Sequence, residues 1–135
     1  MTKGGLIVGA SLPQRVVEVD VSRMKAMALL LRDPNPIHWD VDVNRRLGLG
    51  DLPINQGPIT MSYLIELAVQ SAGGRERIKH MKFRFLGNVF AGQTVVCTGS
   101  VTALDEAAGY AELELVGSVD GEAVITGVAT VELPD

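Results

Sequence analysis

The sequence predicts an α+β domain in which helices come first and a curved antiparallel sheet follows. Helical patterns separated by prolines and glycines occupy the first half of the chain, whereas residues 78–133 form long runs rich in Val, Ala, Gly and Thr. Only 4% of the residues are aromatic. Long runs of small and β-branched side chains suit a sheet that curls tightly around a helix.

The first predicted elements are a short strand and a helix. Residues 15–21 are rich in β-branched side chains and predict the strand. Ser22 is the expected N-cap of a helix over residues 23–32, because its hydroxyl can accept a hydrogen bond from the first turn. One apolar face of this helix is expected to contain Met24, Met27, Ala28 and Leu31. The sequence Asp33-Pro34-Asn35-Pro36 ends the helix, because proline keeps the residue before it extended.

Two more helices and four strands follow. A short helix is expected over residues 41–47, and Gly57-Pro58 begins a longer, mostly apolar helix that runs to about Ala72. This longer helix is the one that the sheet is expected to enclose, since an apolar helix must be buried. The turn residues between the β-rich runs predict strands over 78–86, 94–104, 110–119 and 122–133, as an antiparallel meander.

Composition limits the classes of function. A single domain accounts for residues 1–135, because no linker or repeat divides them. The formal charge of −4, with no run of Lys or Arg, argues against a nucleic-acid or anionic-membrane partner. No segment resembles a signal peptide or reaches the roughly 18 apolar residues of a membrane span. The single Cys97 cannot form an internal disulfide, so we expect a reducing, cytoplasmic setting.

The loop after the first helix carries the strongest chemical signal. Asp33 and His38 lie five residues apart on a backbone that two prolines stiffen. A carboxylate and an imidazole that share one water can act as a general acid/base pair. The alternative is structural: Asp33 caps a turn and His38 is a buried, hydrogen-bonded histidine. A metal site with Asp40 and Asp42 is not favoured, because no further ligand cluster accompanies them.

A second candidate site lies at the start of the longer helix. The Gly57 amide belongs to the first helical turn, where amides lack intrahelical partners and the helix dipole is positive. It can stabilise a carbonyl oxygen that gains negative charge, whereas Pro58 has no N–H to offer. The alternative is an ordinary helix start.

The sequence Asp33-Pro34-Asn35-Pro36-Ile37-His38 resembles the D-x-N-P-[hydrophobic]-H signature of the MaoC-like, R-specific enoyl-CoA hydratases. Gln56-Gly57 falls where that family usually has His-Gly before its central helix, and Ser62 matches a serine that some members carry near the active site. Phe83-Arg84-Phe85 and the segment 89–94 resemble the strand that follows and the start of the next one. The resemblance covers most of the chain in the same order.

The resemblance implies a single hotdog fold and the syn addition of water to a trans-2-enoyl-CoA, or the reverse dehydration. Asp33 and His38 would activate the water, Asn35 would orient them, and the Gly57 amide would polarise the thioester carbonyl. The expected substrate contacts are Gln56, Ser62 and Trp39. No metal or cofactor is implied, since CoA or an acyl carrier protein is part of the substrate.

The family also implies a side-by-side dimer with an identical or a different hotdog partner. Three departures from its pattern are Arg32 for a glycine, Gln56 for a histidine and a short segment before Asp33. They leave open the size of the acyl group, which ranges from short fatty acyl to steroid-like. The alternatives from other classes are a hotdog acyl-CoA thioesterase and a non-catalytic acyl-binding subunit. Cys97 is expected to be a buried structural thiol, and His80 a surface residue.

Overall fold

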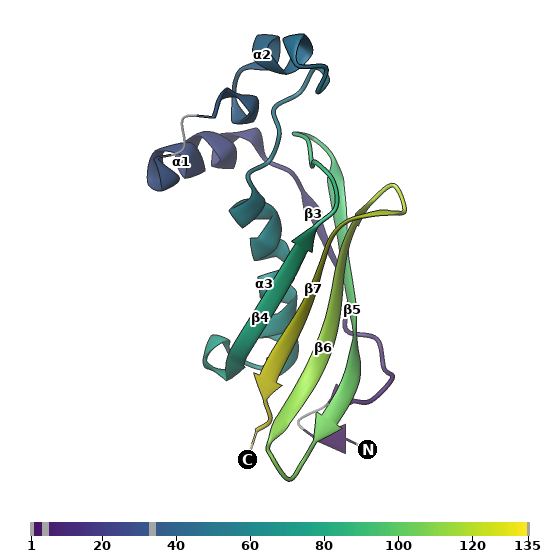
Figure 1. Ribbon diagram of the computed structural model, residues 1–135. Helices are drawn as coiled ribbons and strands as arrows, with labels where there is room; N and C mark the ends of the chain where they lie inside the picture. Colours follow the sequence, from purple (N-terminus) through teal and green to yellow (C-terminus); the bar gives the residue numbers. More distant parts are fainter. Residues whose placement is uncertain (1, 4–5, 33–34, 135) are drawn as a thin grey trace.

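A computed structural model of the chain describes residues 2–3, 6–32 and 35–134. A five-stranded antiparallel sheet curves in front of helix α3 (Gly57–Ala72), with the strand order β3-β5-β6-β7-β4 (Figure 1). The strands are β3 (Arg15–Glu18), β4 (Ile78–Phe85), β5 (Thr94–Asp105), β6 (Tyr110–Val119) and β7 (Glu122–Glu132). The predicted α+β fold, a curved antiparallel sheet around a central helix, is confirmed.

The order of the strands differs from a simple meander. Strands β5, β6 and β7 follow one another as neighbours, but β4 pairs with β7 at the far edge of the sheet. The chain therefore crosses from one edge of the sheet to β5 through residues 86–93. Three strand spacings amount to about 14 Å, which an eight-residue segment can span.

The core lies between α3 and the inner face of the sheet. Seven residues spaced along one face of α3 are buried, among them Leu64, Leu67 and Ala68, which are at most 1% exposed. They pack with sheet residues such as Val95, Leu115 and Ile125. A Cβ on Gly117 would lie 2.8 Å from the side chain of Ile125 on the neighbouring strand, so any other residue here would force Ile125 to shift in the core.

Helix α1 (Val21–Leu31) begins two residues earlier than the sequence suggested. Asp20, not Ser22, is the N-cap: its carboxylate accepts hydrogen bonds from the Ser22 amide at 2.9 Å and from the Ser22 hydroxyl at 2.7 Å. A carboxylate is a cap as good as a hydroxyl, and these bonds lower the pKa of Asp20. Only Met24 of the expected apolar face is fully buried, and Leu31 is exposed.

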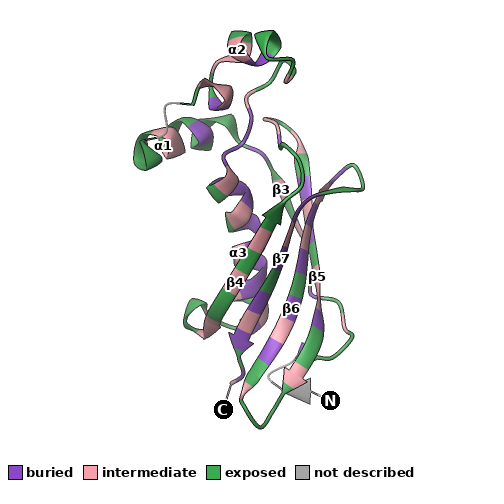
Figure 2. Ribbon diagram, in the orientation of Figure 1, coloured by how far each residue is buried: buried purple, intermediate pink, exposed green. Residues whose placement is uncertain are grey.

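The remaining elements are short. A 3-10 helix, η1 (Pro36–His38), and helix α2 (Val41–Arg46) lie at the end of the molecule where α3 begins, and η2 (Arg75–Arg77) follows α3. Two strands that the sequence did not suggest, β1 (Thr2–Lys3) and β2 (Leu6–Ile7), pair beside the sheet. Figure 2 shows that α1 and α2 are mostly exposed, whereas burial concentrates on α3 and the central strands.

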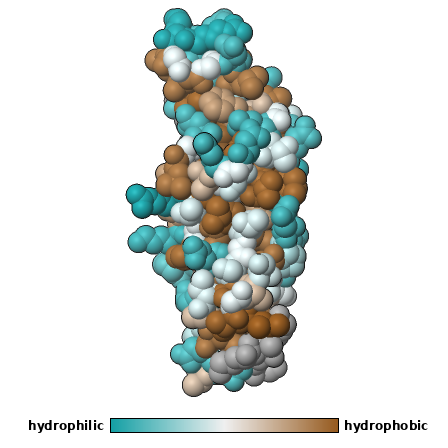
Figure 3. Space-filling view, turned by 90° about the vertical axis from the view of Figure 1, so that its right-hand side faces the viewer, coloured by the Kyte–Doolittle hydropathy of each residue, from teal (hydrophilic) through white to brown (hydrophobic). Residues whose placement is uncertain are grey.

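The surface is mixed in character. On the side that Figure 3 presents, hydrophobic patches alternate with hydrophilic ones and do not join into one band. Within the described residues, no helix is long and apolar enough to cross a membrane.

Candidate active site

The loop that carries the candidate acid/base pair is only partly described. Asp33 and Pro34 lie outside the described residues, so the predicted role of Asp33 stays a prediction. Immediately before them, Arg32 ends α1 in the left-handed conformation, with φ 50° and ψ 41°. A glycine adopts this conformation without strain. The family whose signature the sequence resembles usually has a glycine at this position.

Asn35 forms the start of η1. Its side-chain oxygen accepts a hydrogen bond from the Ile37 amide at 3.3 Å, and Pro36 occupies the first position of the 3-10 turn. Asparagine is a preferred cap residue and proline is preset for the first helical position. The Asn-Pro pair therefore starts a tight turn that directs His38 inward.

His38 is buried, with 8% of its surface exposed. Its Nδ1–H donates a hydrogen bond of 2.6 Å to the carbonyl oxygen of Ile54. A carbonyl can only accept, so Nδ1 carries the hydrogen and, in the neutral ring, the lone pair is on Nε2. Fixing the tautomer in this way leaves Nε2 as the nitrogen that can take up a proton.

Helix α2 holds η1 in place through Asn44, which sequence reasoning missed. The Asn44 side chain is fully buried, and its Nδ2 donates to the carbonyl oxygens of Ile37 at 2.9 Å and Leu52 at 2.8 Å. Two bonds to carbonyls also settle which end of the amide is nitrogen. An asparagine inside a short helix is a weak signal of such a role, because its side chain tends to bond to nearby backbone.

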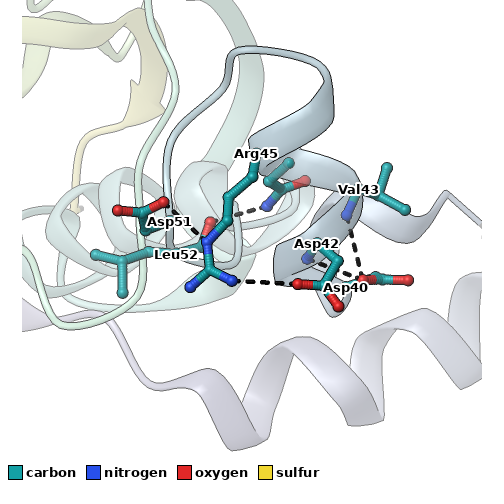
Figure 4. Close-up of polar contacts among 7 residues, drawn as sticks. Asp40, Asp42, Val43, Arg45, Asp51 and Leu52 are labelled. Atoms are coloured by element: carbon teal, nitrogen blue, oxygen red, sulfur yellow. Dashed lines mark hydrogen bonds and ion pairs between the residues drawn. The ribbon is translucent and has the colours of Figure 1, made fainter.

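The acids around α2 have structural partners (Figure 4). The Asp40 carboxylate caps the helix by accepting from the amides of Asp42 and Val43 at 3.0 and 3.3 Å. Arg45 bridges Asp42 at 3.1 Å and Asp51 at 3.0 Å. Among the described residues, no group of three or more His, Cys, Asp or Glu side chains could hold a metal ion.

Residues 53–56 lead from the loop after α2 to the start of α3. The Ile54 amide donates to the Ile37 carbonyl at 2.9 Å, and the Asn55 amide donates to the Val89 carbonyl at 2.6 Å. The segment is thus held on one side by η1 and on the other by the loop after β4. The partner of the His38 ring, Ile54, is only three residues before Gly57.

Gly57 is the first residue of α3 and is close to Phe85 at the end of β4. A Cβ on Gly57 would lie 3.2 Å from Cζ of the Phe85 ring, closer than ordinary van der Waals contact. Phe85 is itself 51% exposed. The aromatic ring therefore borders the amide that sequence analysis proposed as the donor to a carbonyl oxygen.

Gln56 is enclosed by protein, with 1% of its surface exposed. Its Nε2 donates a hydrogen bond of 2.7 Å to the Met24 carbonyl, which ties α1 to the start of α3. Its neighbour Asn55 is also buried and donates to the hydroxyls of Thr60 at 2.9 Å and Tyr63 at 3.3 Å. Burial raises the pKa of Tyr63, and the bond from Asn55 opposes this effect in part. Sequence reasoning missed this second polar cluster.

The other residues singled out in the sequence are either exposed or have a structural role. Trp39, next to His38, is half exposed, and the Ser62 hydroxyl donates to the Ile59 carbonyl at 2.6 Å. His80 is exposed on β4, as expected. Cys97 is fully buried, and burial raises the pKa of its thiol to about 11, so it is a structural thiol as the sequence indicated.

The chain matches a protein-family profile and solved structures over nearly its whole length. The family profile described as "MaoC like domain" matches residues 9–133. No curated protein sequence matches the chain. Among solved structures, the (R)-hydratase from A. caviae involved in PHA biosynthesis has a TM-score of 0.85 and 28% sequence identity, over 96% of this chain and 98% of that one.

Two further structures share the fold at lower identity. R-hydratase PhaJ1 from Pseudomonas aeruginosa has a TM-score of 0.80 and 17% identity, over 97% of this chain and 84% of that one. The ChsH1-ChsH2 complex from Mycobacterium tuberculosis has a TM-score of 0.81 and 23% identity, over 95% and 98%.

Proposed function

Because the chain belongs to the MaoC-like domain family, whose members include hydratases and dehydratases, we propose that it is an R-specific enoyl-CoA hydratase or 3-hydroxyacyl-CoA dehydratase. In this reaction water adds syn across the double bond of a trans-2-enoyl thioester, or leaves in the reverse direction. The observation that carries the proposal is the buried His38, whose Nδ1–H bond to Ile54 leaves Nε2 as the base within the D-x-N-P-x-H segment.

The proposed proton transfers involve Asp33 and His38. The pair holds one water and removes a proton from it as the oxygen bonds to C3 of the enoyl group. It then delivers a proton to C2, so that C3 has gained an oxygen and C2 a hydrogen, and the pair returns to its starting state. A pair of this kind is effective because its groups are held within hydrogen-bond reach of the same water. The Asn35 cap and the His38–Ile54 bond support such a rigid placement.

The proposed stabilisation of negative charge involves Gly57. As oxygen bonds to C3, charge moves through C2 to the thioester carbonyl oxygen. An amide at the start of the 16-residue helix α3 adds the positive end of the helix dipole to its hydrogen bond. The Phe85 ring lies beside Gly57, 3.2 Å from the place that a Cβ there would take, and so borders the start of the helix.

Trp39 and Ser62 are proposed to contact the substrate directly, whereas Gln56, the third residue expected there, is proposed to act through α1. The exposed parts of Trp39 and Ser62 are available to an acyl chain. Gln56 is 1% exposed and its amide nitrogen already binds the Met24 carbonyl, so its contribution is to hold α1, and with it the chain entering residue 33, against the start of α3. The acyl thioester is the only organic group required, and no metal or separate cofactor takes part.

We also propose that the chain works as a dimer, with an identical or a different hotdog subunit, in the cytoplasm. Strands β3 and β4 form the two edges of the sheet and carry unpaired main-chain groups that a second subunit can satisfy. Light scattering of the purified chain tests this: an assembly of at least two subunits is expected, and a monomer that is fully active would contradict it.

The function is tested by following the loss of enoyl-thioester ultraviolet absorbance with trans-2-enoyl-CoA esters of graded size. Asp33→Asn and His38→Asn should each lower kcat by about 1,000-fold or more. Asparagine at position 38 keeps a donor near the place of Nδ1, for the Ile54 carbonyl, and removes Nε2. The matched control is His80→Asn, which changes an exposed histidine and should leave kcat unchanged.

The same assays separate the alternatives. Oxidation of the product by an R-specific, but not an S-specific, 3-hydroxyacyl-CoA dehydrogenase establishes the stereochemistry. Release of free CoA thiol without loss of the double bond would identify a thioesterase. Substrate binding with neither reaction, in the chain alone, would identify a subunit that lacks activity. Full turnover by either variant at 33 or 38 would refute the assigned residues.

A further inference from the structure

The face of the sheet that points away from α3 contains a hollow of about 290 Å³ over strand β7. Its floor is formed by the short side chains of Thr126 and Val128, and Val128 is 45% exposed. Lys82 and Arg84 of β4 border it on one side, and Glu114 of β6 borders it on the other. The face of β4, β6 and β7 that points away from α3 is turned toward the viewer in Figure 1.

The two walls of the hollow carry opposite charge in matched positions. Lys82 on β4 and Glu114 on β6 both lie directly opposite Val128 in the strand register. One row along, His80 and Glu112 both lie opposite Thr130. Across the described residues, neither Lys82 nor Glu114 has an ion-pair partner. The face therefore presents a basic wall and an acidic wall on either side of the uncharged β7 side chains Thr126, Val128 and Thr130.

We propose that this face binds the same face of a second copy of the chain, through a two-fold axis that runs along β7. Rotation about such an axis places β4 of one copy over β6 of the other. Residues that lie opposite one another across the strands keep the same position along the strand direction. The basic wall of one copy then lies over the acidic wall of the other. Lys82 meets Glu114 of the second copy, His80 meets Glu112, and each pair occurs twice.

The floor of the hollow is compatible with this packing. The two Val128 side chains would meet near the axis, and the neighbouring threonines are short, which allows sheets to stack at the usual spacing of about 10 Å. Side chains of Lys and Glu are long enough to meet across that spacing. Glu112 is already oriented, since the Thr130 hydroxyl donates to its carboxylate at 2.7 Å.

This interface is separate from the edge-to-edge dimer of the proposed function. Edge pairing uses main-chain groups of an outer strand, whereas the stacked faces use side chains that stand out of the sheet. The two contacts can coexist, and stacking then doubles the size of the assembly that edge pairing makes. The inference does not depend on the proposed reaction, because it is measured by association alone.

The two-fold geometry allows a charge-exchange experiment. In Lys82→Glu alone, two Glu–Glu contacts replace the ion pairs, and in Glu114→Lys alone, two Lys–Lys contacts do so. Each variant should weaken the stacked association by about 100-fold. In an equimolar mixture, a copy of each variant can pair so that both contacts join a lysine to a glutamate: one contact has the charges exchanged and the other is the original pair. The mass of the assembly by analytical ultracentrifugation should therefore return to the wild-type value.

Matched controls carry the same charge changes elsewhere: Lys25→Glu on α1 and Glu106→Lys in the turn after β5, both exposed. These should keep the wild-type mass, alone and mixed. Circular dichroism establishes that all four variants fold. A wild-type mass in either Lys82→Glu or Glu114→Lys alone would overturn the proposal. A mixture that stays at the reduced mass would overturn it as well.

Discussion

Two regions of the molecule are held together by different forces. Around α3, the interior consists of apolar side chains from the helix and the sheet. Between His38 and Thr60, by contrast, lie all of the buried polar side chains of the described residues: His38, Asn44, Asn55, Gln56 and Thr60. All five of these side chains donate hydrogen bonds to backbone or hydroxyl oxygens.

The difference reflects what each region must do. Apolar contact is non-directional and stabilises the fold in proportion to the area buried. Hydrogen bonds fix direction, because they weaken steeply when their angle changes. A region that is proposed to place an imidazole for proton transfer and an amide for polarising a carbonyl needs direction more than it needs buried area. We therefore expect changes in the apolar region to lower stability, and changes in the polar region to lower activity out of proportion to stability.

The largest loss of stability is expected from Leu64→Ala in the apolar region. Leu64 is fully buried on α3, and its removal should lower the free energy of unfolding by about 3 kcal/mol, because the loss of apolar burial adds to a cavity. Urea denaturation measures this value, and kcat of the folded fraction should stay near wild type. The control is Leu29→Ala, which changes a leucine that is 82% exposed and should have almost no effect. Equal losses in the two variants would contradict the division between the regions.

Asn44→Leu tests the polar region with a side chain of similar volume. It removes the donor to two carbonyls, those of Ile37 and Leu52, and should lower the free energy of unfolding by about 2 kcal/mol. Because η1 then loses its tie to α2, kcat should fall by about 30-fold, more than Leu64→Ala produces. Asn88→Leu, at an exposed asparagine, is the matched control. A loss of stability with an unchanged kcat would mean that Asn44 does not position His38.

The two regions also differ in how well the sequence predicted them. The bounds of α3 and of the long strands were predicted to within about a residue, because hydrophobic periodicity and turn residues are local signals. The prediction of Ser22 as the N-cap of α1 was wrong. Asp20 and Ser22 are both good cap residues, and only the backbone conformation decides which of them caps the helix. Local signals could not predict the strand order either, because β4 pairs with β7, a strand that is far from it in the sequence.

The contacts of the site were beyond local reasoning for a related reason. His38 was identified as a candidate from its motif, but its partner is a backbone carbonyl 16 residues away. The Gln56 bond to Met24 spans 32 residues. Any residue has a carbonyl, so no side-chain pattern marks Ile54 or Met24 as the acceptor. Only the path of the irregular segments between the elements brings these atoms together.

Gly57→Ala tests the boundary between the two regions, where Phe85 of the sheet meets the first residue of α3. The added methyl would lie 3.2 Å from the ring, so either the ring or the start of the helix must move. We expect kcat/KM to fall by about tenfold, and the free energy of unfolding to change by less than about 1 kcal/mol, since alanine also favours the helix.

Adding Phe85→Leu to Gly57→Ala supplies the control. Leucine at position 85 removes the crowding, so the double variant should recover most of the lost kcat/KM, while Phe85→Leu alone should stay close to wild type. A double variant no better than Gly57→Ala would show that the ring does not fix the position of the amide.

The smallest effect is expected from Arg32→Gly, and it is a gain in stability. Arg32 ends α1 with φ 50°, a conformation that strains any side chain with a Cβ and that glycine adopts freely. The relief should exceed the greater entropy that glycine has in the unfolded chain and raise the free energy of unfolding by about 0.5 kcal/mol. Arg46→Gly, inside α2, is the matched control and should be destabilising by a similar or larger amount. Because residue 33 follows directly, kcat reports whether relaxing this cap also moves the proposed carboxylate: an unchanged kcat means that the cap and the acid/base pair are independent, whereas a changed kcat places the end of α1 among the features that position Asp33.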